Sequence, residues 1–275
     1  MQRAEPEPAY SACLNCGEKL LGEFCWRCGQ EAVDLRRPMR DLASDLLDNV
    51  LNLDSKLLRT IGSLLFRPGR LTREYLAGRR APYVRPLKVY LLAALVCFGI
   101  LAIWPQGVVR VVVKPSEPGS AASQRRESAS EREQTYQKAL ADSQRFADAF
   151  TSNLPRAFFL LLPAFALLLE LLYLRRGILY LDHLVFALHF HAFALLVMAV
   201  AILINTRMSP RVAVPIGVAA WLWIFVYLFL AMRAVYRDSW WKAGLRFAAL
   251  LMLYGAAFGL AVYGLMRFTI YRLGS

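Results

Sequence analysis

The sequence lacks the short motifs by which many enzymes are recognised. It contains no Walker loop, no G-x-G-x-x-G, no G-x-S-x-G, no H-E-x-x-H and no nucleobase-deaminase signature. Phosphate-cradling loops, serine-nucleophile elbows and the common zinc-protease site are therefore excluded. No catalytic residue can be named, and a non-enzymatic role is favoured.

Residues 1–33 also lack the apolar segment of a secretory signal peptide. We therefore expect the N-terminus to lie in the cytosol, which is a reducing compartment. Acidic residues are few, at 20 against 33 basic residues, which gives a net charge of +13. Most basic residues flank apolar segments, as topological charges do. We expect them to meet a membrane surface, and we expect no binding of nucleic acid.

Apolar residues, by contrast, are abundant. They make up 57% of the chain, and the mean hydropathy is +0.39, which is too apolar for an ordinary soluble domain. Five apolar runs are each long enough for one membrane crossing; they cover residues 87–104, 157–174, 184–204, 212–232 and 247–266. The predicted fold class is an all-α integral membrane protein with about five transmembrane helices.

The composition divides the chain into five parts. They are a disordered lead-in with a cysteine module (1–33), amphipathic and basic surface helices (34–86), the first span (87–104), an extracytoplasmic polar loop (105–154) and a four-helix bundle (155–275). Within the loop, residues 108–114 could form a strand, and the pattern over 128–150 predicts a helix.

The strongest local signal is a set of four cysteines spaced C-x2-C-x8-C-x2-C: Cys13, Cys16, Cys25 and Cys28. Gly17 and Gly29 follow the two pairs, where the tight turn needs a residue that tolerates positive φ. Four thiolates form a closed tetrahedral shell, so the pattern predicts one structural Zn²⁺ in a zinc ribbon. Two disulfides are the alternative, which a cytosolic location disfavours, and iron is the main competing metal.

Residues 34–66 carry two amphipathic helical patterns. The first contains Leu42, Leu46, Val50 and Leu53, and the second contains Leu57, Leu58, Ile61, Leu64 and Leu65. A short helix over 72–77, ended by Gly78, is expected next. These helices could rest on the bilayer, pack on the bundle or receive a partner, and the pattern leaves all three open.

Basic residues are interleaved with aromatic ones between residues 67 and 90. The basic residues are Arg67, Arg70, Arg73, Arg79, Arg80, Arg85 and Lys88. This mixture is typical of a segment on an anionic membrane surface, with cations on lipid phosphates and rings at headgroup depth. Basic residues beside the spans are more numerous on the side of the N-terminus. We expect a multi-pass protein of the bacterial inner membrane, with the N-terminus in the cytosol and the C-terminus extracytoplasmic.

Polar residues inside apolar spans are candidates for function, because they are costly to bury in lipid. They gather near one end of the second and third spans: Glu170, Asp182, His183, His189 and His191. One hypothesis is a proton relay or metal site made by the first four. The simpler reading, which we favour, is hydrogen bonding between helices. His189 and His191 lie about 200° apart on a helix and cannot both face one site.

Three segments resemble domain-of-unknown-function family 3667, a bacterial family of membrane proteins. They are CLNCG…FCWRCGQ (13–30), RTIGSLLFRPGRLTREYLAGRRAPYVRPLKVYLL (59–92) and LDHLVFALHFHAF (181–193). The resemblance implies a membrane protein with a tethered zinc ribbon, whose ligand positions match the four cysteines. The histidine-containing motif matches Asp182, His183, His189 and His191. No activity or ligand follows from the resemblance.

The leading functional hypothesis is a docking or scaffold protein, in which the zinc ribbon and basic helices bind a cytosolic protein partner. Its basis is a closed metal site beside a basic segment. The alternatives are a small-solute or ion transporter and an intramembrane enzyme that acts on lipid, both using the Glu170, Asp182, His183 and His189 cluster.

Overall fold

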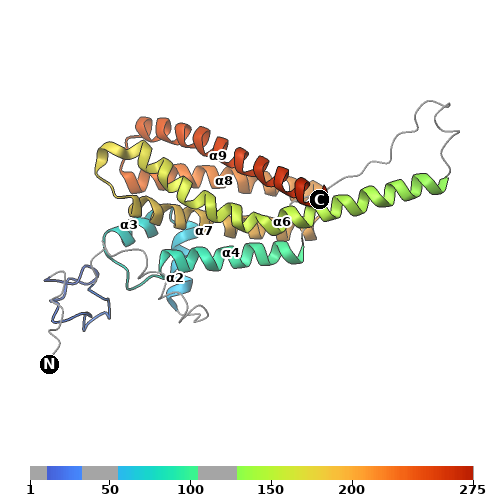
Figure 1. The fold of residues 1–275 in the computed structure, drawn as a ribbon. Coiled ribbons are helices and arrows are strands. Elements are labelled where there is room, and N and C mark those ends of the chain that lie inside the picture. The colour runs from blue at the N-terminus through green and yellow to red at the C-terminus, as the bar shows by residue number, and fades with distance from the viewer. Residues whose placement is uncertain (1–10, 33–54, 105–128, 275) are drawn as a thin grey trace, which may run out of the picture.

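The computed structural model describes residues 11–32, 55–104 and 129–274, and Figure 1 shows their arrangement. The first predicted amphipathic helix and the possible strand at 108–114 lie outside these residues. The described helices are α2 (Ser55–Phe66), α3 (Arg70–Leu76), α4 (Pro86–Ile103), α6 (Ala129–Tyr173), α7 (Tyr180–Arg207), α8 (Pro210–Tyr236) and α9 (Trp240–Gly274), with a 3-10 turn at Leu174–Arg176.

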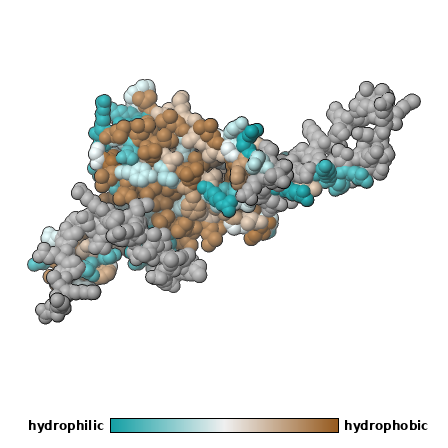
Figure 2. All heavy atoms as spheres, viewed as in Figure 1, coloured by the Kyte–Doolittle hydropathy of each residue, from teal (hydrophilic) through white to brown (hydrophobic). Residues whose placement is uncertain are grey.

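Five helices are long and apolar enough to cross a membrane. The candidate spans are Pro86–Ile103, Ser152–Arg176, Tyr180–Arg207, Pro210–Tyr236 and Trp240–Phe268. No strand is named among the described residues, so the predicted all-helical membrane fold is confirmed. Figure 2 shows apolar side chains covering the middle of the bundle, with polar ones towards its ends.

The helix predicted over 128–150 and the second predicted span form one continuous helix, α6. Pro155 and Pro163 lie inside this helix without ending it. The sequence suggested a division near residue 155, because polar residues give way to apolar ones there. The change of composition marks where α6 becomes a candidate span, and the backbone continues through it.

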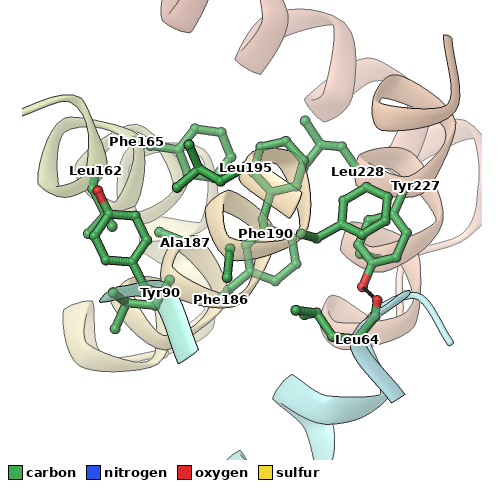
Figure 3. Packing of buried hydrophobic residues seen from close by; sticks show 14 of the residues in the cluster. Leu64, Tyr90, Leu162, Phe165, Phe186, Ala187, Phe190, Leu195, Tyr227 and Leu228 are labelled. Atoms are coloured by element: carbon green, nitrogen blue, oxygen red, sulfur yellow. Dashed lines mark hydrogen bonds between the residues drawn. The ribbon is translucent and has the colours of Figure 1, made fainter. Parts of the chain in front are cut away.

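The core is centred on α7, which packs against α4, α6 and α8. Figure 3 shows aromatic side chains filling the space between these helices. Phe165 of α6 stacks on Phe190 of α7 with 5.4 Å between ring centroids, and Phe193 stacks on Tyr227 of α8 at 3.6 Å. Cys97 of α4 is buried in this core, as expected for a packing residue.

α4 is the shortest of the candidate spans, and α6 extends beyond its first residue. The ring of Tyr90, one turn into α4, contacts Phe159 at 5.5 Å between centroids, and α6 then continues to Tyr173. At 1.5 Å per residue, α6 extends roughly 15 Å past the first residue of α4. The hairpin of α2 and α3 lies beside the bundle at this end and packs on α7 and α8.

The second amphipathic helix therefore packs on the bundle. This is one of the three arrangements that the sequence left open. Leu64 of α2 and Leu71 of α3 are buried, and the Tyr227 hydroxyl donates to the Leu64 carbonyl oxygen at 2.6 Å, as Figure 3 shows. α3 begins at Arg70, two residues earlier than predicted, and Gly78 follows it with φ of 81°.

Candidate metal centre and its attachment to the bundle

Residues 11–32 fold into a small module, called here the cysteine module. Each C-x2-C pair forms a tight turn that ends in a glycine with positive φ, 77° at Gly17 and 68° at Gly29. The N–H of each glycine donates to the carbonyl oxygen of the first cysteine of its pair at 2.8 Å. These turns point the thiols of both pairs towards one point.

The four thiols have the geometry of a single-ion site. Their sulfur atoms all lie within 4.8 Å of one another, with Cys13–Cys28 at 3.6 Å and Cys16–Cys25 at 3.5 Å. A tetrahedral shell with metal–sulfur bonds of 2.3 Å places its sulfurs about 3.8 Å apart. Disulfide bonding, in contrast, needs about 2.05 Å. The four cysteines could therefore hold one metal ion, as the sequence predicted.

The cysteine module is attached to the loop between α3 and α4. The Gln30 side chain donates from Nε2 to the Gly78 carbonyl oxygen at 2.8 Å, and its Oε1 accepts from the N–H groups of Arg80 and Ala81, both at 3.0 Å. Leu14 packs on Gly78, where an added Cβ would come within 2.5 Å of the Leu14 Cδ1. Gln30 and Leu14 of the module thus both contact the turn at residues 78–81.

The predicted lipid-contacting residues lie in the sequence within this turn and on both sides of it. Arg67, Arg73, Arg79 and Arg85 are exposed, whereas Arg70, Arg80 and Lys88 are partly buried. Arg80 lies over the Tyr75 ring at 4.6 Å, and Arg79 pairs with Glu74 at 2.5 Å, whose hydrogen bond lowers the pKa of Glu74. Some of these cations therefore have protein partners; their contact with lipid stays a prediction.

The hairpin is fitted closely to the bundle at Gly69. This residue has φ of 71°, and a Cβ there would lie 2.9 Å from the Ala231 carbonyl oxygen on α8. One turn further, the Thr72 hydroxyl and His189 Nδ1 share a hydrogen bond of 2.9 Å, and both side chains are buried. The hairpin is thus joined to α7 and α8 by polar as well as apolar contacts.

The polar residues predicted inside the spans have separate partners. His183 Nδ1 bonds to the Tyr236 hydroxyl at 2.8 Å, whereas His191 Nε2 bonds to the Tyr254 hydroxyl at 2.9 Å. Asp182 lies in the first turn of α7, 3.4 Å from the Leu179 N–H, and Glu170 is partly buried on α6. His189 and His191 face different helices, in line with their angular separation.

Among the described residues, these side chains are not brought together as a group of three or more candidate metal ligands. Within residues 11–32, 55–104 and 129–274, the four cysteines are the one group of three or more candidate ligands that lie close together. The contacts of His183, His189 and His191 join α7 to α8, α3 and α9. These histidines therefore make hydrogen bonds between helices, and any functional role for them stays a prediction.

Sequence reasoning missed Asp238, a buried carboxylate in the turn between α8 and α9. Its side chain is 0% exposed. It accepts hydrogen bonds from the Tyr173 hydroxyl at 2.9 Å, from Arg246 at 2.7 Å and from Arg176. Arg176 also donates to the Tyr236 carbonyl oxygen at 2.7 Å. Basic residues that flank spans are expected to set topology, but these two arginines also connect the ends of three helices.

The fold and the site define a helical membrane-spanning protein with a four-cysteine module at one end of its bundle. Residues 54–98 match the family model described as "Protein of unknown function (DUF3667)". The match covers α2, α3 and most of α4, so the expected resemblance is confirmed over this segment. Comparisons with curated proteins and with solved structures find no match to the chain.

Proposed function

We propose that this is a membrane-anchored docking protein, whose zinc-bound cysteine module binds a cytosolic protein partner at the membrane surface. One observation carries the proposal. The module is fixed to the bundle through Gln30 and Leu14, yet it leaves large apolar side chains exposed: Leu21 by 78%, Trp26 by 69% and Phe24 by 60%. Exposed aromatic residues on a rigid support are typical of protein-binding surfaces.

The proposed metal is one structural Zn²⁺. Its four ligands would be Cys13, Cys16, Cys25 and Cys28, whose sulfur separations suit a tetrahedral shell. Four thiolates leave no coordination position for a substrate or a water molecule. The ion would therefore hold the two turns together, because a module with so small a core has little else to stabilise it.

The proposed location of the module is the cytosolic face of a bacterial inner membrane. Its support is the group of basic residues in the α3–α4 loop, to which the module is attached. Free thiols also keep their reduced state in that compartment. Arg79 and the other arginines of this loop would bind the phosphates of anionic lipids and hold the loop at the membrane surface.

The alternative functions, transport and lipid chemistry, depended on a joint site made by Glu170, Asp182, His183 and His189. The described residues give His183 and His189 different partners on different helices. No specific observation favours either alternative, and we do not propose them.

Affinity capture from cells treated with a membrane-permeant crosslinker tests the docking function. The Cys13→Ser/Cys28→Ser variant is expected to lose the partner recovered with the wild type, because the module does not keep its folded structure without the metal. Cys97→Ala is the matched control, since it removes a cysteine outside the module, and it should retain the partner. Identical partners for wild type and the double variant would contradict docking by the module.

A further inference from the structure

The cysteine module is an internal two-fold repeat with an offset of twelve residues. Cys13 N–H donates to Glu18 O at 2.8 Å, and Cys25 N–H donates to Gln30 O at 2.9 Å. The bridge between Ala12 and Lys19 recurs between Phe24 and Glu31. The Cys13–Cys28 sulfur pair likewise corresponds to the Cys25–Cys16 pair. Each half of the module therefore repeats the backbone of the other about the candidate metal position.

The repeat gives the module two equivalent faces. The first consists of Leu14 and Gln30, and it is occupied by the chain's own turn at Gly78–Ala81. The equivalents of Leu14 and Gln30 in the repeat are Trp26 and Glu18. We call Trp26 and Glu18 the second face.

The second face is assembled in the same way but is open. Arg27, next to Trp26, donates to Glu18 Oε2 at 3.2 Å, which places the second cysteine turn beside Glu18. Trp26 is 69% exposed, and the Glu18 side chain, 29% exposed, is paired with an Arg27 side chain that is 62% exposed. An exposed ion pair such as Arg27–Glu18 contributes little stability and is easily exchanged for another cation.

We propose that the second face binds a basic, glycine-containing turn of a partner polypeptide, an inference that rests on the proposed docking function. On the first face, Gln30 both donates to a carbonyl oxygen and accepts from two N–H groups. Glu18, when ionised, can only accept. Its ligand therefore offers consecutive N–H groups together with positive charge.

Trp26 adds to this preference. Its indole ring presents a larger flat face than Leu14 and attracts guanidinium groups. The turn on the first face has the sequence Gly-Arg-Arg-Ala over residues 78–81, and its glycine lies against Leu14, where a Cβ would not fit. A turn of this kind on another protein can donate N–H groups to the Glu18 carboxylate and place a guanidinium group on the Trp26 ring.

The experiment uses the zinc-loaded full chain in phosphatidylcholine nanodiscs and a labelled, capped peptide with the sequence of residues 76–83. The chain's own turn occupies the first face, so the peptide reports on the second. Anisotropy is expected to show saturable binding of one peptide per chain. Trp26→Ala should weaken that binding by about tenfold or more, as expected for an aromatic anchor, and Glu18→Gln should also weaken it.

Glu23→Gln is the matched control for Glu18→Gln, because it removes an exposed carboxylate of the module outside both faces. It should leave peptide binding unchanged, and zinc content shows that each variant is folded. Equal binding by wild type and Trp26→Ala, or no saturable binding up to about 1 mM peptide, would overturn the proposal. The proposal would also be overturned, in favour of lipid contact, by a different result. In it, the wild type in nanodiscs binds phosphatidylglycerol vesicles but not the peptide, and Trp26→Ala loses the binding to vesicles.

Failure here can be told apart from failure of the docking function. If the peptide does not bind but capture still depends on Cys13 and Cys28, the module docks a partner through another surface. If capture does not depend on these cysteines either, both proposals are wrong.

Discussion

Replacing Asp238 with alanine is expected to lower the free energy of unfolding of the bundle by about 3–5 kcal/mol, the cost of removing one partner from a buried ion pair. The Asp238 side chain is fully buried and accepts from Arg176, Arg246 and Tyr173. Its removal leaves two guanidinium groups and a hydroxyl without their acceptor. Thermal unfolding or denaturant titration in a mild detergent measures the loss.

A second substitution shows whether the unpaired charge is the cause. Adding Arg246→Met to Asp238→Ala should recover part of the lost stability, because it removes one of the two cations left unpaired. Additive losses from the two substitutions would contradict this account of the cluster.

The same carboxylate makes stability depend on pH. Burial by itself raises the pKa of Asp238, but the hydrogen bonds from Arg246 and Tyr173 outweigh it and lower the pKa below its ordinary value. A carboxyl with a lowered pKa stabilises the fold above its unfolded pKa of about 3.9. That contribution to stability is lost as the pH falls from the unfolded pKa through the lower pKa of the folded state. Asp238→Ala should therefore lose less stability than the wild type over this range of pH.

Replacing Gly69 with alanine is expected to release the α2–α3 hairpin from α8. Gly69 has a positive φ, and a residue with a Cβ adopts that conformation at a cost of about 1–2 kcal/mol. The new Cβ would also meet the Ala231 carbonyl oxygen at 2.9 Å. The hairpin should open, exposing Leu64 and Leu71. Hydrogen exchange at α2 and α3 measures the release.

Gly62→Ala is the matched control within the same hairpin. Gly62 lies inside α2, and a Cβ there meets no atom within 4 Å. Since alanine favours a helix interior over glycine by about 1 kcal/mol, this variant should be neutral or slightly more stable. Equal hydrogen exchange in the Gly69→Ala and Gly62→Ala variants would contradict the close fit at Gly69.

The membrane-spanning fold could be predicted from the sequence because a long apolar segment satisfies its own backbone hydrogen bonds inside a bilayer by forming a helix. Runs of apolar residues therefore report the five spans almost directly. The cysteine turns were equally clear, since C-x2-C followed by glycine requires one local geometry. These features depend on neighbouring residues alone.

The attachment of the hairpin was not predictable in the same way. An amphipathic helix such as α2 can bury its apolar face in lipid or on protein, and both environments suit Leu64 equally. The outcome is decided by the short α4 and by the fit at Gly69, which bring together residues far apart in the chain. The shortness of α4 is visible in its apolar run, but the fit at Gly69 leaves no local signal in the sequence.

Asp238 was missed for a related reason. A single carboxylate in a short turn between two spans has the appearance of a surface residue, and its partner Arg176 is 62 positions away. The continuity of α6 was hidden because Pro155, which often ends a helix, coincides with the change of composition.

Photo-crosslinking at the two equivalent positions of the cysteine module tests the central claim most directly. A benzophenone amino acid replaces either Leu14 or Trp26 in cells, and the products are mapped by mass spectrometry. We expect position 14 to crosslink within the chain, near Gly78, and position 26 to crosslink to a different polypeptide. The same products from both positions, or crosslinks from position 26 only to its own chain or to lipid, would contradict it.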